Sequence, residues 1–280
     1  MISGFLLVNK DSGISSFRVV QILKKKFNLS KVGHLGTLDP MATGLLIIAI
    51  NRATKFASLF LQSEKSYRAE VTLGIQTDTD DIEGEAISFK DVNINENEIK
   101  ETLLTFLGES DQLPPNYSAL KYKGKPMYKY AREGIKVEKP PRQITIKNIQ
   151  NIEIKLPKVS FDIKCSKGTY IRSIARDLGL RLGCGAHLSQ LIRTGQEKFM
   201  LYDAFSIDDI SLDQLISLED AFEYLDFVQL NKRDSKAFIN GRPIKTDFDH
   251  INLLRVYDAN NQFIAIGKNT SKGFKHEYLV

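Results

Sequence analysis

Asp39 is the acidic residue whose neighbours best suit it to chemistry. It precedes Pro40, which pushes it away from helical geometry, and Gly36 and Gly44 lie close on either side. Glycines allow tight turns and the close approach of a ligand, and a buried apolar strand is expected at residues 45–50. A carboxylate on a stiff loop before such a strand favours a reactive role, whereas turn chemistry alone favours an Asx-type turn residue.

Metal chemistry is the first alternative that the sequence raises. The acidic loop 77–85 resembles a cation site, but the helix–loop–helix calcium motif requires Gly at its sixth position and Glu at its twelfth. Counted from the second residue of the loop, those positions hold Glu83 and Phe89, so we exclude calcium. Cys165 and Cys184 form no CxxC pair, and no histidine has zinc spacing. We therefore expect no metal site, and two small buried thiols.

The basic charge is concentrated in one segment. The chain of 280 residues carries a net charge of +5, yet residues 119–147 hold nine Lys or Arg and two acidic residues. Four tyrosines lie in or beside this segment: Tyr117, Tyr122, Tyr128 and Tyr130. Cations neutralise phosphates and aromatic rings stack on unpaired bases, so the pattern favours RNA. A solvated surface loop stays open, because net charge speaks only to nonspecific association.

Five motifs follow one another along the chain. They are the N-terminal stretch 8–16, the Asp39 loop 36–44 (GTLDPMATG), the strand with its acidic loop at 65–84, the segment 114–134 beginning PPNYSALK, and the pair 165–172 (CSKGTYIR) with 183–187 (GCGAH). In content and order they resemble the TruB family, the tRNA pseudouridine-55 synthases. The resemblance extends from about residue 4 to residue 195, and five ordered motifs are far more specific than any one of them.

The resemblance implies a set of catalytic residues. It assigns the nucleophile to Asp39, its partner to Arg172 and an active-site ring to Tyr67. A carboxylate suits the reaction because it can attack covalently or support positive charge on the sugar. A guanidinium beside it favours the ionised form. Tyr67 could stack on the base or move a proton, although its alternation with polar neighbours also fits a core position.

The resemblance also implies residues that contact the substrate. His34 would occupy the space left by a uridine that is flipped out, at a cost of a few kcal/mol. Leu191 would line the uracil pocket, Tyr170 would lie beside the substrate, and Lys10 would support the loop or a phosphate. Asp11 stands where proline is usual, which puts the geometry of this N-terminal segment in doubt but not the role of the nucleophile.

The elements that must position these residues follow from hydrophobic periodicity. We expect strands at 5–8, 45–50, 67–73 and 159–165, and helices at 15–27, 53–61, 99–106 and 171–178. The third helix should end at Gly108, and the fourth at Gly179 or Gly183. These residues alone support an α+β class. The family resemblance implies a pseudouridine synthase fold, with a mixed, largely antiparallel sheet flanked by helices.

Two parts are expected along the chain. Residues 1–228 would form the catalytic domain, with a thumb-like RNA-binding insertion at 113–142, since a structureless loop of that length is unusual unless functional. Residues 229–280 would form a small β-rich, PUA-like RNA-binding appendage, in which a hairpin is expected at 253–267.

The leading hypothesis is an isomerase, free of metal and cofactor, that converts uridine 55 in the T-psi-C arm of tRNA to pseudouridine. The alternative is a noncatalytic tRNA-binding or RNA-folding module. A base-excising glycosidase would usually need a second positioned carboxylate. With no apolar run of about 20 residues and no basic region before the first apolar stretch, we expect no membrane contact. We further expect a cytoplasmic monomer without an obligatory protein partner.

Overall fold

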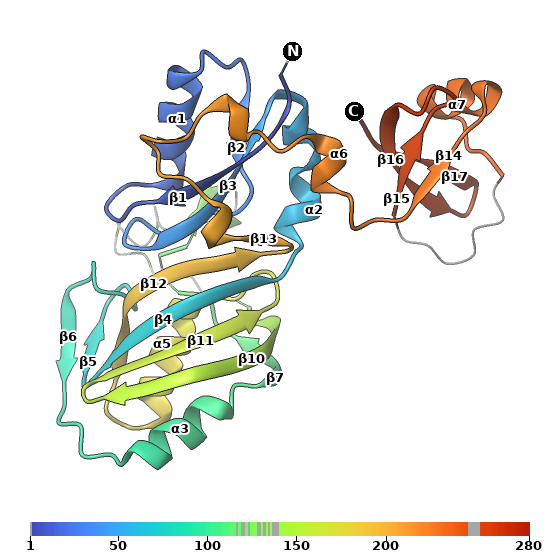
Figure 1. Cartoon of the computed structure of the whole chain (residues 1–280). Helices are drawn as coiled ribbons and strands as arrows, with labels where there is room; N and C mark the ends of the chain where they lie inside the picture. Colours follow the sequence, from blue (N-terminus) through green and yellow to red (C-terminus); the bar gives the residue numbers. More distant parts are fainter. Residues whose placement is uncertain are drawn as a thin grey trace.

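The computed structural model describes residues 2–115, 117–118, 121–122, 124–127, 130, 133, 135, 140–245 and 253–280. Within these residues the chain forms a nine-stranded sheet and a separate four-stranded sheet near the C-terminus (Figure 1). Helices lie against both sheets, which confirms the predicted α+β class. Over the same described ranges, no helix combines the length and the apolar character that crossing a bilayer requires.

The large sheet is mixed and largely antiparallel, as the resemblance implied. Its main path runs β1 (Gly4–Lys10), β3 (Thr43–Ile50), β12 (Ala186–Gln196), β4 (Lys65–Leu73), β11 (Lys158–Cys165), β10 (Arg142–Lys155) and β7 (Gly108–Gln112), while β2 (Val32–His34) and β13 (Phe199–Met200) pair beside it. β3 and β12 run parallel, and the other pairs on the path are antiparallel. β12 therefore joins the N-terminal strands to the rest of the sheet.

The elements around the Asp39 loop form as their residues predict. α1 (Ser16–Lys26) has Ser15 as its N-cap, and the Ser15 hydroxyl accepts a hydrogen bond from the Arg18 amide at 3.1 Å. This bond satisfies one of the unpaired amides at a helix start. β3 is apolar and almost wholly buried, as expected for a strand covered on both faces. After it, the short 3-10 helix η1 (Asn51–Phe56) and α2 (Ala57–Leu61) occupy the position of the expected second helix.

Two helices differ from the expected ends. α5 (Ile171–Arg181) passes through Gly179, and Gly183, with φ of +75°, follows its end. Gly179 serves close packing instead, because a Cβ there would lie 2.2 Å from the Ala186 nitrogen of β12. α3 (Glu96–Leu104) ends before Gly108, which opens β7. Both helices pack against the strands of the large sheet.

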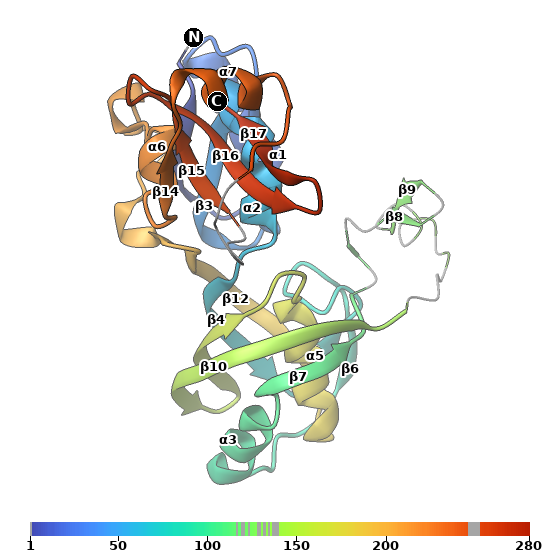
Figure 2. The same ribbon diagram turned by 90° about the vertical axis from the view of Figure 1, so that its right-hand side faces the viewer.

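Two hairpins extend from this core. β5 (Ile75–Thr77) and β6 (Ala86–Phe89) flank the acidic loop. β8 (Lys121–Tyr122) and β9 (Lys125–Pro126) pair within the expected insertion and project away from the sheet in Figure 2. The Tyr122 and Tyr130 rings meet edge to face at 5.8 Å. Tyr128 lies outside the described residues.

The C-terminal part forms its own sheet. The strands of this sheet are β14 (Phe227–Gln229), β15 (Leu254–Tyr257), β16 (Phe263–Thr270) and β17 (Gly273–Leu279), and the helix α7 (Lys232–Ile239) follows β14. The segment that leads into this part contains three short helices: η2 (Leu201–Asp203), η3 (Leu212–Gln214) and α6 (Leu218–Ala221). The expected hairpin at 253–267 is confirmed as β15 and β16. The sheet begins at Phe227, just before the expected boundary at residue 229. The Tyr278 ring lies 5.2 Å from the Phe56 ring of η1, so this sheet contacts the N-terminal part of the chain.

Candidate active site

The Asp39 loop lies between β2 and β3, and hydrogen bonds hold its backbone in place. The Ser16 hydroxyl accepts from the Leu38 amide at 2.8 Å and donates to the Leu38 carbonyl at 3.0 Å. The Pro40 carbonyl accepts from the Gly13 amide at 2.9 Å. Asp39 stands between these anchored residues, so its carboxyl group extends from a fixed backbone.

Asp39 and Arg172 meet, as the resemblance implied. Arg172 lies in the first turn of α5, with its Nε 2.9 Å from Oδ2 of Asp39, and its Nη2 donates to Oδ1 at 3.2 Å. The arginine side chain is 6% exposed and the aspartate 34%. Burial raises the pKa of the Asp39 carboxyl, and the positive charge of Arg172 opposes that rise. The two-point contact therefore both orients the carboxylate and favours its ionised form.

The acidic loop supplies further partners for the arginines of α5. Nη1 of Arg172 lies 3.4 Å from Oδ2 of Asp81, and Nη1 of Arg176 lies 3.1 Å from Oδ2 of Asp80. Both aspartates are buried. The sequence suggested a cation site or a family motif at this loop, and these ion pairs were not predicted. The usable signal was two adjacent aspartates and two arginines four residues apart on one helix.

α5 also anchors the root of the insertion. Nη2 of Arg172 donates to the Tyr117 carbonyl at 2.9 Å. The Leu113 carbonyl accepts from the Ser173 hydroxyl at 2.8 Å and from Nη2 of Arg176 at 3.0 Å. The arginine that holds Asp39 is therefore also bonded to the backbone of the insertion at 113–142.

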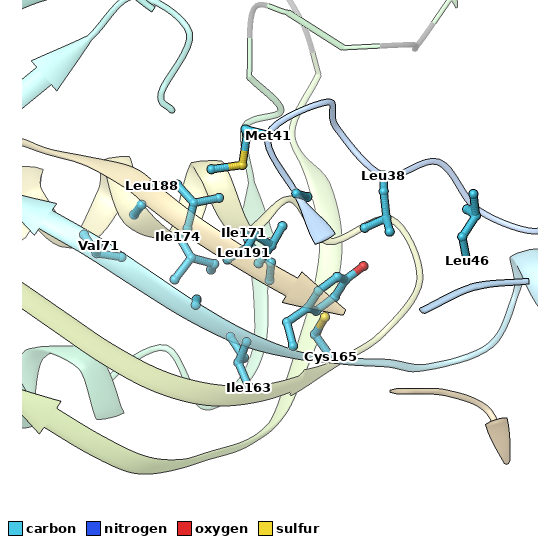
Figure 3. Close-up of a cluster of buried hydrophobic side chains, with 14 of the residues drawn as sticks. Leu38, Met41, Leu46, Val71, Ile163, Cys165, Ile171, Ile174, Leu188 and Leu191 are labelled. Atoms are coloured by element: carbon cyan, nitrogen blue, oxygen red, sulfur yellow. The ribbon is translucent and has the colours of Figure 1, made fainter. Parts of the chain in front are cut away.

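Tyr67 and Leu191 lie on neighbouring strands, β4 and β12, and both are buried. Figure 3 shows Leu191 in an apolar cluster that also includes Leu38 of the loop and Ile171 of α5. Burial raises the pKa of the Tyr67 hydroxyl, which keeps this ring neutral at physiological pH. The site therefore combines a buried apolar cluster with the charged pair of Asp39 and Arg172.

Lys10 supports the loop from β1. Its side chain is fully buried, and Nζ donates to the carbonyls of Asp11 at 2.9 Å, Ile14 at 2.7 Å and Pro40 at 3.2 Å. Burial lowers its pKa to about 8. This geometry matches the loop-supporting alternative rather than a phosphate contact. Asp11, the departure from the family pattern, takes part through its backbone.

His34 and Tyr170 lie at the ends of elements near the loop. His34 closes β2 and is half-buried, and its Nδ1 has no hydrogen-bond partner in the described part of the chain. Burial is the main cause that lowers the pKa of the His34 imidazole, and the positive charge of Arg193 lowers it further. Tyr170 is the N-cap residue of α5, and the Gln112 side chain bonds both its amide (2.8 Å) and its carbonyl (3.0 Å). Burial raises the pKa of the Tyr170 hydroxyl.

Arg193 of β12 is a candidate that was not predicted from the sequence. It is 1% exposed, and its guanidinium carbon lies 5.7 Å from the centre of the Tyr67 ring. A lone arginine directly after Leu191 and Ile192 was the available signal, since a charge in an apolar strand is rarely buried without a specific partner.

In the ranges that the structure describes, no three His, Cys, Asp or Glu side chains gather where they could hold a metal ion. Cys165 and Cys184 are buried free thiols, as predicted. Burial raises the pKa of Cys165 to about 11, so this thiol stays protonated.

Comparisons with known proteins agree with the motifs. The family model of the TruB family pseudouridylate synthase N-terminal domain matches residues 24–171. Models of the tRNA pseudouridylate synthase B C-terminal domain and of the pseudouridine synthase II TruB C-terminal region match residues 172–229 and 227–274.

Relatives and solved structures extend this match over the chain. A tRNA pseudouridine synthase B of Alkaliphilus oremlandii is 42% identical over 88% of this chain and 84% of its own length, and one of Clostridium kluyveri is 41% identical over 97% of both. A chain in an H/ACA RNP bound to a substrate RNA containing 2'-deoxyuridine has the same fold, with a TM-score of 0.73 at 24% identity over 99% of this chain and 84% of that one. The matched family model and these relatives show that the chain belongs to the TruB family of pseudouridylate synthases.

Proposed function

We propose that this protein converts uridine 55 in the T-arm of tRNA to pseudouridine, with Asp39 as the nucleophile. The family membership and the names of the relatives support pseudouridine synthesis in tRNA. The observation that carries the proposal is the two-point contact between Asp39 and Arg172 on an anchored loop.

The reaction is an isomerisation that a carboxylate can assist. The bond from ribose C1′ to uracil N1 breaks, and a bond from C1′ to C5 forms. The proton that C5 loses is matched by one that N1 gains, so atoms and electrons balance without a co-reactant. Asp39 could attack covalently or support positive charge on the sugar while the base turns. Both routes require an ionised carboxylate, which Arg172 favours.

The target base must leave its stack to reach Asp39. Flipping costs a few kcal/mol of stacking and pairing, and we assign the compensating contacts to Tyr67 and Leu191. The Tyr67 ring would stack on uracil or move a proton, and Leu191 would pack against the base. His34, at the end of β2, would fill the space that the base leaves.

The rest of the RNA would be held by two regions that carry clusters of cations, the basic insertion at 113–142 and the C-terminal part at 229–280. A depression of about 760 Å³ beside α7 supports the second assignment. Its cationic lining residues are exposed: Arg233, Lys236, Arg242 and Lys245. Lysine and arginine at such positions neutralise phosphates. We propose a cytoplasmic monomer that needs no protein partner.

The alternative is a noncatalytic tRNA-binding or RNA-folding module. It accounts for the basic regions equally well. It gives no reason to hold the Asp39 carboxylate at a site that receives a polyanion, because like charges repel. The ion pair with Arg172 thus favours chemistry over binding alone.

The test is to incubate unmodified tRNA with the wild type, Asp39→Asn and Asp91→Asn and to map pseudouridine by position. Asp91 is an exposed residue far along the chain from the site and controls for the same chemical change. We expect the wild type and Asp91→Asn to modify uridine 55, and Asp39→Asn to make no product. An inactive wild type would refute the enzyme proposal, and an active Asp39→Asn would refute the assignment of the nucleophile. Product at another uridine would refute the position.

A further inference from the structure

Two side chains of β12 hold the backbone that leads to Asp39. Nε2 of Gln196 donates to the Leu35 carbonyl at 2.8 Å. Arg193 donates to the next two carbonyls, Gly36 from Nη1 at 3.2 Å and Thr37 from Nη2 at 2.8 Å. Three consecutive carbonyls of the loop are therefore bound from one strand.

Both side chains are also fixed at their other contacts. Arg193 and Gln196 are each 1% exposed. Nη1 of Arg193 also donates to the Leu45 carbonyl at 3.3 Å, and Nε2 of Gln196 to the Phe60 carbonyl at 2.9 Å. Their hydrogen bonds thus connect the loop to the strand and the helix that follow it. Carbonyl partners also compensate in part for the cost of burying the guanidinium charge.

An irregularity in β12 allows both side chains to reach the loop. Residues three apart in a regular strand point to opposite faces. The pairing of β12 with β4 shifts register between Arg193 and Gly195, and such bulges redirect side chains. In β3, the parallel neighbour of β12, Gly44 lies opposite Arg193 and has φ of +97°. A Cβ at Gly44 would lie 2.4 Å from the Arg193 carbonyl oxygen. The close approach of β3 thus depends on glycine at this position.

We infer that Arg193 and Gln196 are positioning residues for the reaction, which fix residues 35–37 so that Asp39 meets both Arg172 and the base. This inference rests on the proposed function. Asp39 follows Thr37 by two residues, so a shift of the hydrogen-bonded carbonyls of residues 35–37 moves the Asp39 carboxylate directly. A misplacement of about 1 Å at a reacting group can lower a rate about 100-fold.

The charge of Arg193 gives the inference a second readout. The charged and titratable groups that face Asp39 are Lys10, Tyr67, Asp81, Glu83, Tyr170, Arg172 and Arg193. Among them, Arg172 and Arg193 lower the pKa of Asp39, whereas Asp81 raises it. Removing the Arg193 charge should therefore raise the pKa of Asp39 and move the acidic limb of the rate profile to higher pH.

The experiment compares Arg193→Met, Arg193→Lys and Gln196→Met with Gln190→Met, which makes the same change at an exposed position of β12. Single-turnover pseudouridine formation and tRNA affinity are measured on each preparation. We expect a rate about 100-fold lower for Arg193→Met and about 10-fold lower for Gln196→Met. The tRNA affinity of both variants and the rate of the Gln190→Met control should stay unchanged. Arg193→Lys should recover part of the rate and keep the acidic limb of the wild type.

Two results would overturn the inference. The first is a wild-type rate in both Gln196→Met and Arg193→Lys. These variants decide the question if Arg193→Met does not fold. The second is a loss of rate that only follows the folded fraction seen in thermal unfolding, because that shows a structural role alone. A wild type that makes no pseudouridine refutes the proposed function instead, so the two failures are distinguishable.

Discussion

The charges around Asp39 and those beside α7 are held in opposite ways. Near Asp39, Arg172 and Arg193 are buried and bonded to carboxylates or carbonyls at fixed distances. Beside α7, the four cations line an open depression and are exposed. Buried groups keep their geometry and act strongly at short range, whereas exposed charges are screened by salt.

The difference suggests a division of labour between chemistry and binding. Changes in the buried region should lower the rate of pseudouridine formation and leave tRNA affinity intact. Changes beside α7 should weaken affinity and its salt dependence and leave the maximal rate intact.

The largest effect that we expect here is that of Arg172→Lys. Lysine keeps the charge but cannot make the two-point contact with Asp39. The single-turnover rate should fall on the order of 100-fold or more, with tRNA affinity unchanged. Arg176→Lys is the matched control, since Arg176 pairs with Asp80 rather than Asp39. Equal losses in the two variants would contradict the special role of Arg172.

The pH dependence should follow Asp39. Burial raises the pKa of this carboxyl in the folded protein, and only the ionised form can act as the nucleophile. The rate should therefore be full above that pKa and fall about tenfold per pH unit below it, while tRNA binding changes little. A rate that stays constant down to the range of an ordinary aspartate, about 3.9, would contradict the prediction.

Lys10→Met should affect the scaffold more than the contact with RNA. The variant leaves the Asp11 and Ile14 carbonyls without the ammonium donor. We expect unfolding to require about 1–3 kcal/mol less free energy, seen as a melting temperature lower by a few degrees. The affinity for tRNA should stay the same. A weaker affinity with a reduced salt slope would instead identify Lys10 as a phosphate contact.

The smallest effect on the rate is expected from Lys236→Gln combined with Arg242→Gln. Affinity for tRNA should fall several-fold and the salt slope should drop by about 2, with no change in rate at saturating tRNA. Lys100→Gln combined with Lys155→Gln removes the same charge from exposed positions elsewhere. If this pair has an equal effect, binding depends on overall charge and the depression has no special role.

Local patterns could predict much of the scaffold. The alternation of apolar and polar residues predicted β4 and β11, and the two serines at 15 and 16 marked the start of α1, where the structure has Ser15 as the N-cap. Pro40 and the nearby glycines identified the Asp39 loop as unusual. The partner Arg172 came only from the family resemblance, since 133 residues separate the two in sequence.

The remainder depended on long-range contacts that no local pattern encodes. β12 was not predicted as a strand, because its alternation is broken by the register shift near Arg193 and by buried polar residues such as His187 and Gln196. The hydrogen bonds from Arg193 and Gln196 to the carbonyls of residues 35–37 were not predicted for the same reason. Asp80 and Asp81 belong to a loop that the sequence suggested only as a cation site or a family motif, and the fold places two arginines against them.

The role of Asp39 as the nucleophile is tested most directly by measuring tRNA affinity and pseudouridine formation on one preparation of Asp39→Asn. We expect wild-type affinity and no product, because the exchange removes the reactive carboxylate while the basic regions remain. Pseudouridine formation at the wild-type rate would contradict this role.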